Sequence, residues 1–317
     1  MKRRELLQGA AAFGVLAAMP FSAAGKLLAS ARAAAAPTSG SDATGKHPQA
    51  RPSPLTPPAQ GSIPVGFLVS EGAVVIDFCG PWEVFQDALV PGRQEAPFRL
   101  YTVAETTRPI RASAGLTIVP DYTLESAPAP KVIVIPAQHG HSEAMLQWIR
   151  RASKGADLTM SVCTGAMLLA KTGLLSGKSA TTHHDFFRIF AMEFPDVRLR
   201  RGARFVEEGN LASAGGLSSG VDLALRVVER YYGRDAAMKT ADYMEYQGQG
   251  WLNPNANAAY AVARVSTDAH PLCPVCTMDV DPKTAPKSVY KGKTYYFCTA
   301  DHKTLFDAAP GKFMDAA

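Results

Sequence analysis

The chain has 317 residues, of which 47% are hydrophobic and 19% charged, and its net charge at pH 7 is +5. These values are ordinary for a globular protein that is soluble in water, and the length allows one medium domain and one small domain. No stripe of basic residues interleaved with aromatic residues is found, so the sequence gives little support to nucleic-acid binding.

The N-terminus predicts an export signal of the twin-arginine type over residues 1–36. Arg3 and Arg4 precede a modestly apolar stretch rich in Ala and Gly, and small residues then offer cleavage sites. That stretch is short and weakly hydrophobic for a membrane span, so we expect no stable membrane anchor. The mature protein is therefore expected in a bacterial periplasm, and residues 37–62, rich in Pro, Ser, Gly and Ala, predict a disordered linker.

Residues 63–250 predict one α/β domain, because strand-like apolar runs alternate with helical patterns. The near-continuous apolar character of residues 132–136 predicts a parallel strand that is buried on both faces. In such sheets, ligands bind beyond the carboxyl ends of the strands. We expect three segments to meet there: residues 71–82, residues 136–141 and the turn at Cys163.

Cys163 lies between a strand-like run and an apolar helical pattern, and Gly165 follows it closely. This pattern predicts a tight strand-to-helix turn, which is the geometry of a nucleophile elbow with sulfur in place of a hydroxyl group. The positive end of the following helix would favour the thiolate. The alternative is a buried cysteine that packs as a small hydrophobic residue.

The segment VCTGAMLLAKTGLLSGKSATTHH resembles the ThiJ/PfpI superfamily, in particular the branch that contains isonitrile hydratases and the amidase-like domains of some transcription regulators. The resemblance lies in Cys163, Thr164 and Gly165, in residues 173–175 and in residues 180–183. It implies a flavodoxin-like α/β fold, of the kind found in class I glutamine amidotransferases, with a parallel sheet sandwiched by helices. No cofactor is expected in this domain.

The same resemblance implies an acidic partner for Cys163, and Asp77 takes that position in VIDFCGPWEVF. Asp77 would act as a general acid or base, and Thr164 would be a polar positioning group. Alternatively, Asp77 is a helix N-cap. His183 could complete a Cys–His pair oriented by Asp185, or could be a locally satisfied core residue.

Four further residues have open roles. His184 stands where many members of the branch have tryptophan, and His139 and His141 could bind a polar substrate or belong to a solvated loop. Cys79 could pair with Cys163 in a disulfide.

The C-terminal residues 270–317, after a linker over residues 251–269, predict a small metal-binding module. Cys273 and Cys276 form a Cys-x-x-Cys pair, and Cys298 and His302 form a later Cys-x-x-x-His pair. Three thiolates and one imidazole suit a tetrahedral zinc site, although thiolates also accept copper(I). The pattern resembles a YHS domain; the alternative is a small module held together by disulfides.

Two functions are consistent with these features. The first is an exported enzyme that uses Cys163 to hydrate or hydrolyse a small carbon–nitrogen or carbonyl substrate. The second is a non-catalytic periplasmic protein for metal binding or metal stress, with the α/β domain as a scaffold. The expected partners are a small-molecule substrate and a metal ion, and the chain could form a homodimer.

Overall fold

The computed structural model describes residues 52–262 and 264–314. The predicted export signal lies outside these residues. A seven-stranded sheet forms the centre of the larger domain, in the order β10-β11-β7-β6-β1-β2-β5. All its pairings are parallel except that of β10 with β11. The strands are β1 (Ile63–Leu68), β2 (Phe98–Ala104), β5 (Tyr122–Thr123), β6 (Val132–Ile135), β7 (Leu158–Val162), β10 (Phe205–Glu208) and β11 (Leu211–Ala214).

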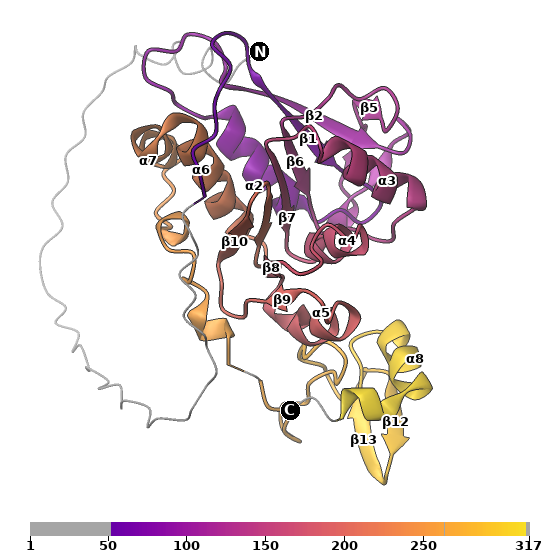
Figure 1. Ribbon diagram of the computed structural model, residues 1–317. Coiled ribbons are helices and arrows are strands. Elements are labelled where there is room, and N and C mark those ends of the chain that lie inside the picture. Colours follow the sequence, from indigo (N-terminus) through magenta and orange to yellow (C-terminus); the bar gives the residue numbers. More distant parts are fainter. Residues whose placement is uncertain (1–51, 263, 315–317) are drawn as a thin grey trace, which may run out of the picture. The chain divides into compact units, whose positions relative to one another are not determined.

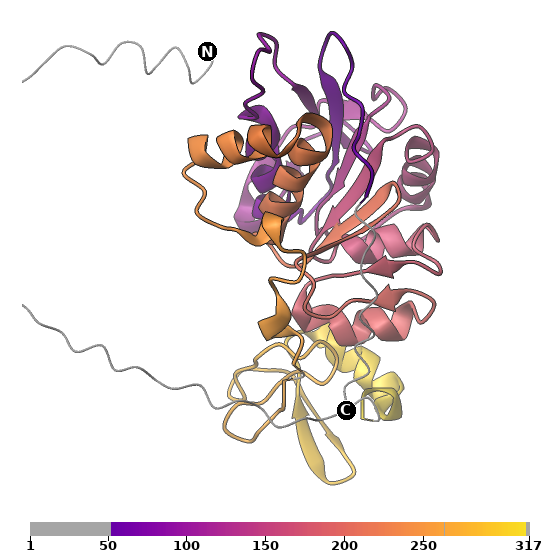
Figure 2. The same cartoon turned by 60° about the vertical axis from the view of Figure 1, so that its left-hand side comes forward.

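Helices cover both faces of this sheet, as the resemblance implied (Figure 1). One face packs against α2 (Val75–Gln86), α6 (Ser219–Tyr232) and α7 (Arg234–Tyr243). The opposite face packs against α3 (Glu143–Ala152) and α4 (Gly165–Lys171). Figure 2 shows the three layers from the side. The predicted flavodoxin-like α/β sandwich is confirmed.

The position of β6, between helices on both faces of the sheet, explains why its sequence is apolar at every position. Val132 and Val134 pack in the core under α2 and α6, whereas Ile133 and Ile135 pack in the core under α3 and α4. All four side chains are fully buried, because successive side chains of a strand point to opposite faces and both faces are covered.

The helix α2 begins six residues before its proline, Pro81. Proline favours the first turn of a helix, but α2 starts at Val75 and Pro81 lies inside it. Asp77 is therefore in the first turn, where its side chain does not cap the helix. The early start places Asp77 on the buried side of α2, with no exposed surface.

Shorter elements complete the larger domain. Two small sheets pair β3 (Ile110–Arg111) with β4 (Thr117–Ile118) and β8 (Ser179–Ala180) with β9 (Arg198–Leu199). A 3₁₀ turn over His184–Phe186 leads into α5 (Phe187–Glu193). In the described part of the chain, no helix has the length and apolar character needed to cross a bilayer.

Two segments predicted as linkers contact the α/β domain. Leu55 N donates to Arg230 O at 2.8 Å, within the segment before β1. Trp251 is buried, and its N–H donates to Asp222 Oδ1 at 2.8 Å. Asp222 is also paired with Arg204, whose Nη2 lies 2.5 Å from Oδ2. The chain after α7 therefore packs against α6 before it reaches the C-terminal module.

The C-terminal module consists of a hairpin and a helix. Its elements are β12 (Lys287–Tyr290), β13 (Lys293–Tyr296), α8 (Ala300–Ala308) and a 3₁₀ turn over Pro310–Phe313. Lys291 and Gly292 both have positive φ, as a two-residue type I′ hairpin turn requires. The small apolar core of the module includes Phe297, Phe306 and Phe313.

Candidate functional site

The turn at Cys163 joins β7 to α4 and has the strained backbone of a nucleophile elbow. Cys163 has a φ of 58°, a conformation that residues other than glycine seldom adopt. Gly165 is required two residues later, because a Cβ there would lie 2.1 Å from the carbonyl oxygen of Ile135. The backbone N–H groups of Thr164 and Leu217 both point to the Cys163 sulfur and stabilise its charged form.

Asp77 is the acidic group that the fold brings to Cys163. Its Oδ2 accepts a hydrogen bond from Ala137 N at 3.1 Å, and the carboxyl group interacts with the Cys163 thiol. The other carboxyl oxygen, Oδ1, is buried, and none of the described residues forms a hydrogen bond of normal length with it. Burial raises the pKa of Asp77 to about 7, so the carboxyl group can hold or release a proton near neutral pH.

The pKa of the Cys163 thiol is raised, whereas the sequence predicted that the thiolate would be favoured. Burial is the main cause that raises its pKa to about 12, and the charge of Asp77 adds to the increase. The two N–H donors lower the pKa but do not offset the loss of solvent. In the free protein Cys163 is therefore a neutral thiol, only 8% exposed.

Thr164 and His183 lie at this turn but make different contacts from those expected. Thr164 acts on the sulfur through its backbone N–H. His183 packs against Gly216, where a Cβ would lie 2.2 Å from the ring. No hydrogen bond joins His183 to Cys163 among the described residues, so the carboxyl group of Asp77, and not an imidazole, is the direct partner of the sulfur.

His183, His184 and Asp185 form a second group of potential metal ligands. Nδ1 of His183 lies 3.6 Å from Asp185 Oδ2, and it also accepts a hydrogen bond from Asp185 N at 3.3 Å. The ring of His184 stacks on His183 and on Tyr260. The guanidinium group of Arg264 lies 3.6 Å from Asp185 Oδ1. That cation already faces the carboxylate and disfavours a metal ion there.

The segment over residues 136–141 lies beside the segment that precedes α2, as expected. Val74 N donates to Ala137 O at 2.8 Å, and His139 N donates to Glu71 O at 2.9 Å. The ring of His139 covers Gly72, where a Cβ would lie 2.3 Å from Nδ1. These contacts hold the Ala137 N–H in place for Asp77.

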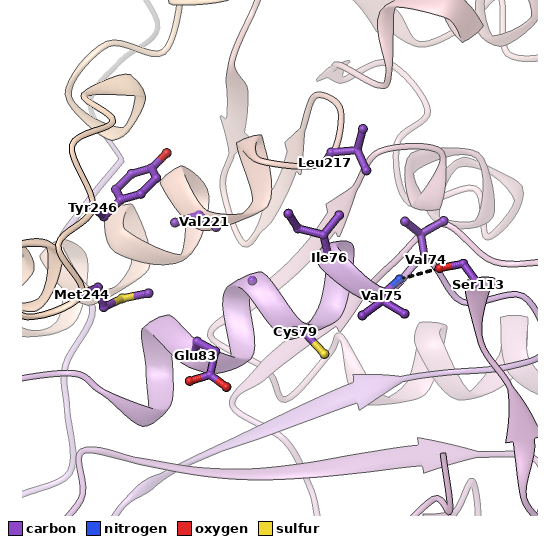
Figure 3. A pocket seen from close by; sticks show the side chains of 11 residues that line it. Val74, Val75, Ile76, Cys79, Glu83, Ser113, Leu217, Val221, Met244 and Tyr246 are labelled. Carbon is purple, nitrogen blue, oxygen red and sulfur yellow. Dashed lines mark hydrogen bonds between the residues drawn. The ribbon is translucent and has the colours of Figure 1, made fainter. Parts of the chain in front are cut away.

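Cys79 lines a mainly apolar pocket of about 650 Å³, which Leu217 also lines. Figure 3 shows Ile76, Cys79 and Glu83 along one side of α2, with Val221 of α6 opposite. Burial and the nearby Glu83 raise the pKa of the Cys79 thiol. All five cysteines are free, so the disulfide between Cys79 and Cys163 is absent.

The four predicted metal ligands of the C-terminal module converge. Cys276 Sγ lies 3.5 Å from Cys298 Sγ, and His302 Nδ1 lies 3.1 Å from Cys298 Sγ and 3.7 Å from Cys273 Sγ. A tetrahedral site with metal–sulfur bonds of about 2.3 Å has sulfur–sulfur edges of about 3.8 Å. The donors therefore fit one metal ion without rearrangement of the chain.

The backbone of this cluster fixes the position of its donors. The turn that holds Cys273 and Cys276 ends at Thr277, which has a φ of 63°, and Thr277 N donates to Cys273 O at 2.8 Å. Thr299 caps α8 by accepting a hydrogen bond from His302 N. Hydrogen bonds from its neighbours lower the pKa of Cys273, so one thiolate forms readily in this cluster.

Residues 64–230 match the model of the DJ-1/PfpI family. The chain belongs to this family. Residues 273–317 match the model of the YHS domain. Over 194 residues the chain is 32% identical to an isonitrile hydratase of Pseudomonas putida, covering 58% of this chain and 79% of that protein.

Other relatives place the same domain in a regulator and in solved structures. The chain is 24% identical to the transcriptional regulator GbdR of Pseudomonas aeruginosa, over 58% of this chain and half of that protein. A ThiJ/PfpI family protein from Pseudomonas syringae is similar with a TM-score of 0.53 and 26% identity, over 64% of this chain and 84% of that one. Drosophila melanogaster DJ-1beta shares the fold, with a TM-score of 0.51 and 20% identity. The match covers 59% of this chain and all of that one.

Sequence reasoning did not identify three groups that act at these sites. The N–H groups of Ala137 and Leu217 are backbone donors, which carry no signal in residue type. Arg264 lies in a segment read only as a linker, and nothing in its local pattern indicated a partner so distant in sequence as Asp185.

Proposed function

We propose that the chain is an enzyme that adds water to a small carbon–nitrogen or carbonyl substrate at Cys163 and Asp77, with an isonitrile as the first candidate. The observation that carries this proposal is the Asp77 carboxyl group, which is buried beside a strained elbow cysteine and has a pKa of about 7. Such a group can donate and recover a proton at neutral pH. The similarity to the isonitrile hydratase supports the choice of substrate class.

For an isonitrile R–NC, the pair would act in two steps. First, Asp77 gives its proton to the terminal carbon, the Cys163 sulfur bonds to that carbon, and the thiol proton passes to Asp77. This forms the thioimidate R–N=CH–S–Cys and restores the carboxylic acid. Water then adds to the carbon as Asp77 protonates the nitrogen. The carbon–sulfur bond then breaks and R–NH–CHO leaves. Of the two protons of the added water, one returns to the sulfur through the carboxylate and the other restores the carboxylic acid of Asp77.

The test is turnover of small isonitriles, nitriles and 2-oxoaldehydes by the mature chain. We expect Cys163→Ser and Asp77→Asn each to lower kcat/KM at least about 10³-fold, because each removes a group that touches the reacting atoms. Cys79→Ser, which removes a thiol that neither step uses, should leave the rate unchanged. Full turnover by Cys163→Ser would overturn the proposal.

The second candidate is a non-catalytic metal protein with the α/β domain as a scaffold. The raised pKa of Cys163 favours it, because a neutral, buried thiol is a poor nucleophile. Under this alternative, no substrate class turns over. Metal affinity would then depend on Cys273 and be indifferent to Cys163→Ser.

For the C-terminal module we propose zinc, with copper(I) as the alternative. Four convergent donors suit the tetrahedral preference of zinc. We expect one equivalent of zinc per chain, and cobalt(II) substitution should give a thiolate charge-transfer band together with tetrahedral ligand-field bands. Cys298→Ser should abolish that spectrum. If copper(I) instead occupies the site when one equivalent of zinc is also present, the alternative is established.

We also propose export through the twin-arginine route to a periplasm, on the strength of Arg3 and Arg4. A homodimer in solution is a further proposal. Sedimentation of the mature chain tests it.

A further inference from the structure

The C-terminal module packs on the elements that surround Cys163. Its core, which includes Cys273, Cys276 and Phe297, also contains Ile189 of α5, and Met167 of α4 packs against it. The Arg188 side chain of α5 donates to the carbonyl oxygen of Phe313. The helix α4 follows Cys163 directly, so the metal cluster shares one apolar core with the helix of the elbow.

A second set of contacts joins the metal-ligand turn to the chain beside Cys163. Arg264 bridges the two: its Nη2 lies 2.6 Å from Asp279 Oδ2, its Nη1 donates to Thr277 O at 3.2 Å, and Nη1 lies 3.6 Å from Asp185 Oδ1. Thr277 follows the ligand Cys276, and its hydroxyl donates to Asp185 O at 3.5 Å. We call these contacts the Arg264 bridge.

The Asp185 end of the bridge leads to the elbow within three residues. Asp185 contacts His183 through both its N–H and its carboxylate. His183 packs on Gly216, the neighbour of Leu217, whose N–H faces the Cys163 sulfur. Thr182 Oγ1 donates to Cys163 O at 2.9 Å. The segment over residues 182–185 is thus held by the elbow at one end and by the metal-ligand turn at the other.

We propose that the metal-loaded module holds residues 182–192 against the elbow through the Arg264 bridge, so that metal occupancy controls access to Cys163. About 45 residues bury too little apolar surface to fold easily alone, so the module depends on its metal. Loss of the metal releases the ligand turn, the bridge and the shared core. Cys163, 8% exposed in the docked state, then becomes open to reagents.

The experiment measures the rate at which iodoacetamide alkylates Cys163 in the mature chain, read by mass spectrometry of its peptide, with zinc loaded or removed by chelation. We expect alkylation about tenfold faster after chelation, because the local opening that exposes the thiol becomes easier. Cys79, on α2, provides an internal control whose rate should not change. This readout needs no substrate, so it stands apart from the hydration proposal.

Two variants of the Arg264 bridge distinguish regulated access to Cys163 from a general loss of stability. Arg264→Gln and Asp185→Asn should each keep one equivalent of zinc but show fast alkylation whether zinc is present or not. Lys303→Gln, which breaks the exposed ion pair with Asp307 in the same module, should keep the zinc dependence of the parent chain.

Two results would overturn the proposal. One is an alkylation rate of Cys163 that stays the same after zinc is removed, although hydrogen exchange shows that the hairpin of the module has opened. The other is a full response to zinc in both bridge variants.

Discussion

Asp77 is the residue whose environment decides the chemistry of this site. It lies in the first turn of α2 with no exposed surface; the N–H of Ala137 donates to its carboxyl group, and the Cys163 thiol interacts with it. These two contacts do not replace the water lost on burial, so the pKa of Asp77 rises from 3.8 to about 7. The same burial that makes Asp77 a proton donor at neutral pH makes its charged form costly to the fold.

The cost predicts a pH-dependent effect of Asp77→Asn on stability. Because the folded state holds this proton more tightly than the unfolded chain, wild-type stability falls as the pH rises from about 4 to about 7. Above that range the buried charge costs up to about 4 kcal/mol, at roughly 1.4 kcal/mol per pKa unit. Asparagine carries no charge, so the variant should be the more stable protein at pH 8, with the advantage shrinking toward pH 4.5.

Urea unfolding at pH 4.5, 6 and 8 measures this difference. Asp235→Asn on α7, where the carboxylate is exposed, serves as the control and should show no such trend. A constant difference between Asp77→Asn and the wild type across the three pH values would contradict the burial argument.

At the scale of elements, the start of α4 lies so close to the end of β6 that there is no room for a side chain at Gly165. A Cβ at this position would lie 2.1 Å from Ile135 O and 2.8 Å from Pro136 O, and backbone atoms cannot move aside as a flexible side chain can. The elbow therefore depends on the close approach of α4 to the end of β6, independently of any catalytic role.

We expect Gly165→Ala to destabilise the domain by about 3 kcal/mol or more, as overpacking against backbone does. The matched control is Gly155→Ala, at an exposed site where a Cβ would meet no atom within 4 Å. That change should stay within about 1 kcal/mol of the wild type. Denaturant midpoints compare the two, and an equal, small effect at both positions would show that the elbow is looser than described.

At the scale of the whole molecule, a DJ-1/PfpI domain is combined with a YHS module that carries four potential metal ligands. The proposed twin-arginine route would carry the chain already folded, which suits our proposal that the module needs its metal before it packs on the α/β domain. We expect replacement of Arg3 and Arg4 by lysine to retain the protein inside the cell, as fractionation would show. Replacement of Lys2 by arginine, which leaves the pair intact, should not block export.

The sequence by itself determined the features that depend on neighbours along the chain. The apolar runs specify the strands, the Cys163 and Gly165 spacing specifies the turn, and the two cysteine-containing pairs specify a metal cluster, because backbone geometry and ligand spacing are local properties. The α/β fold was predictable for the same reason. The start of α2 at Val75 was not, because proline favours the first turn of a helix and Pro81 lies inside this one.

Only the tertiary structure decided the chemistry of the elbow. The positive end of α4 favours a thiolate, but the pKa of Cys163 rises because burial and the carboxylate of Asp77 outweigh that field. Burial is set by every element that packs on a site, and the partners of Cys163, from Asp77 to the N–H of Leu217, come from distant parts of the sequence. The Arg264 bridge has the same origin, since Arg264 and Asp185 meet only when the chain has folded.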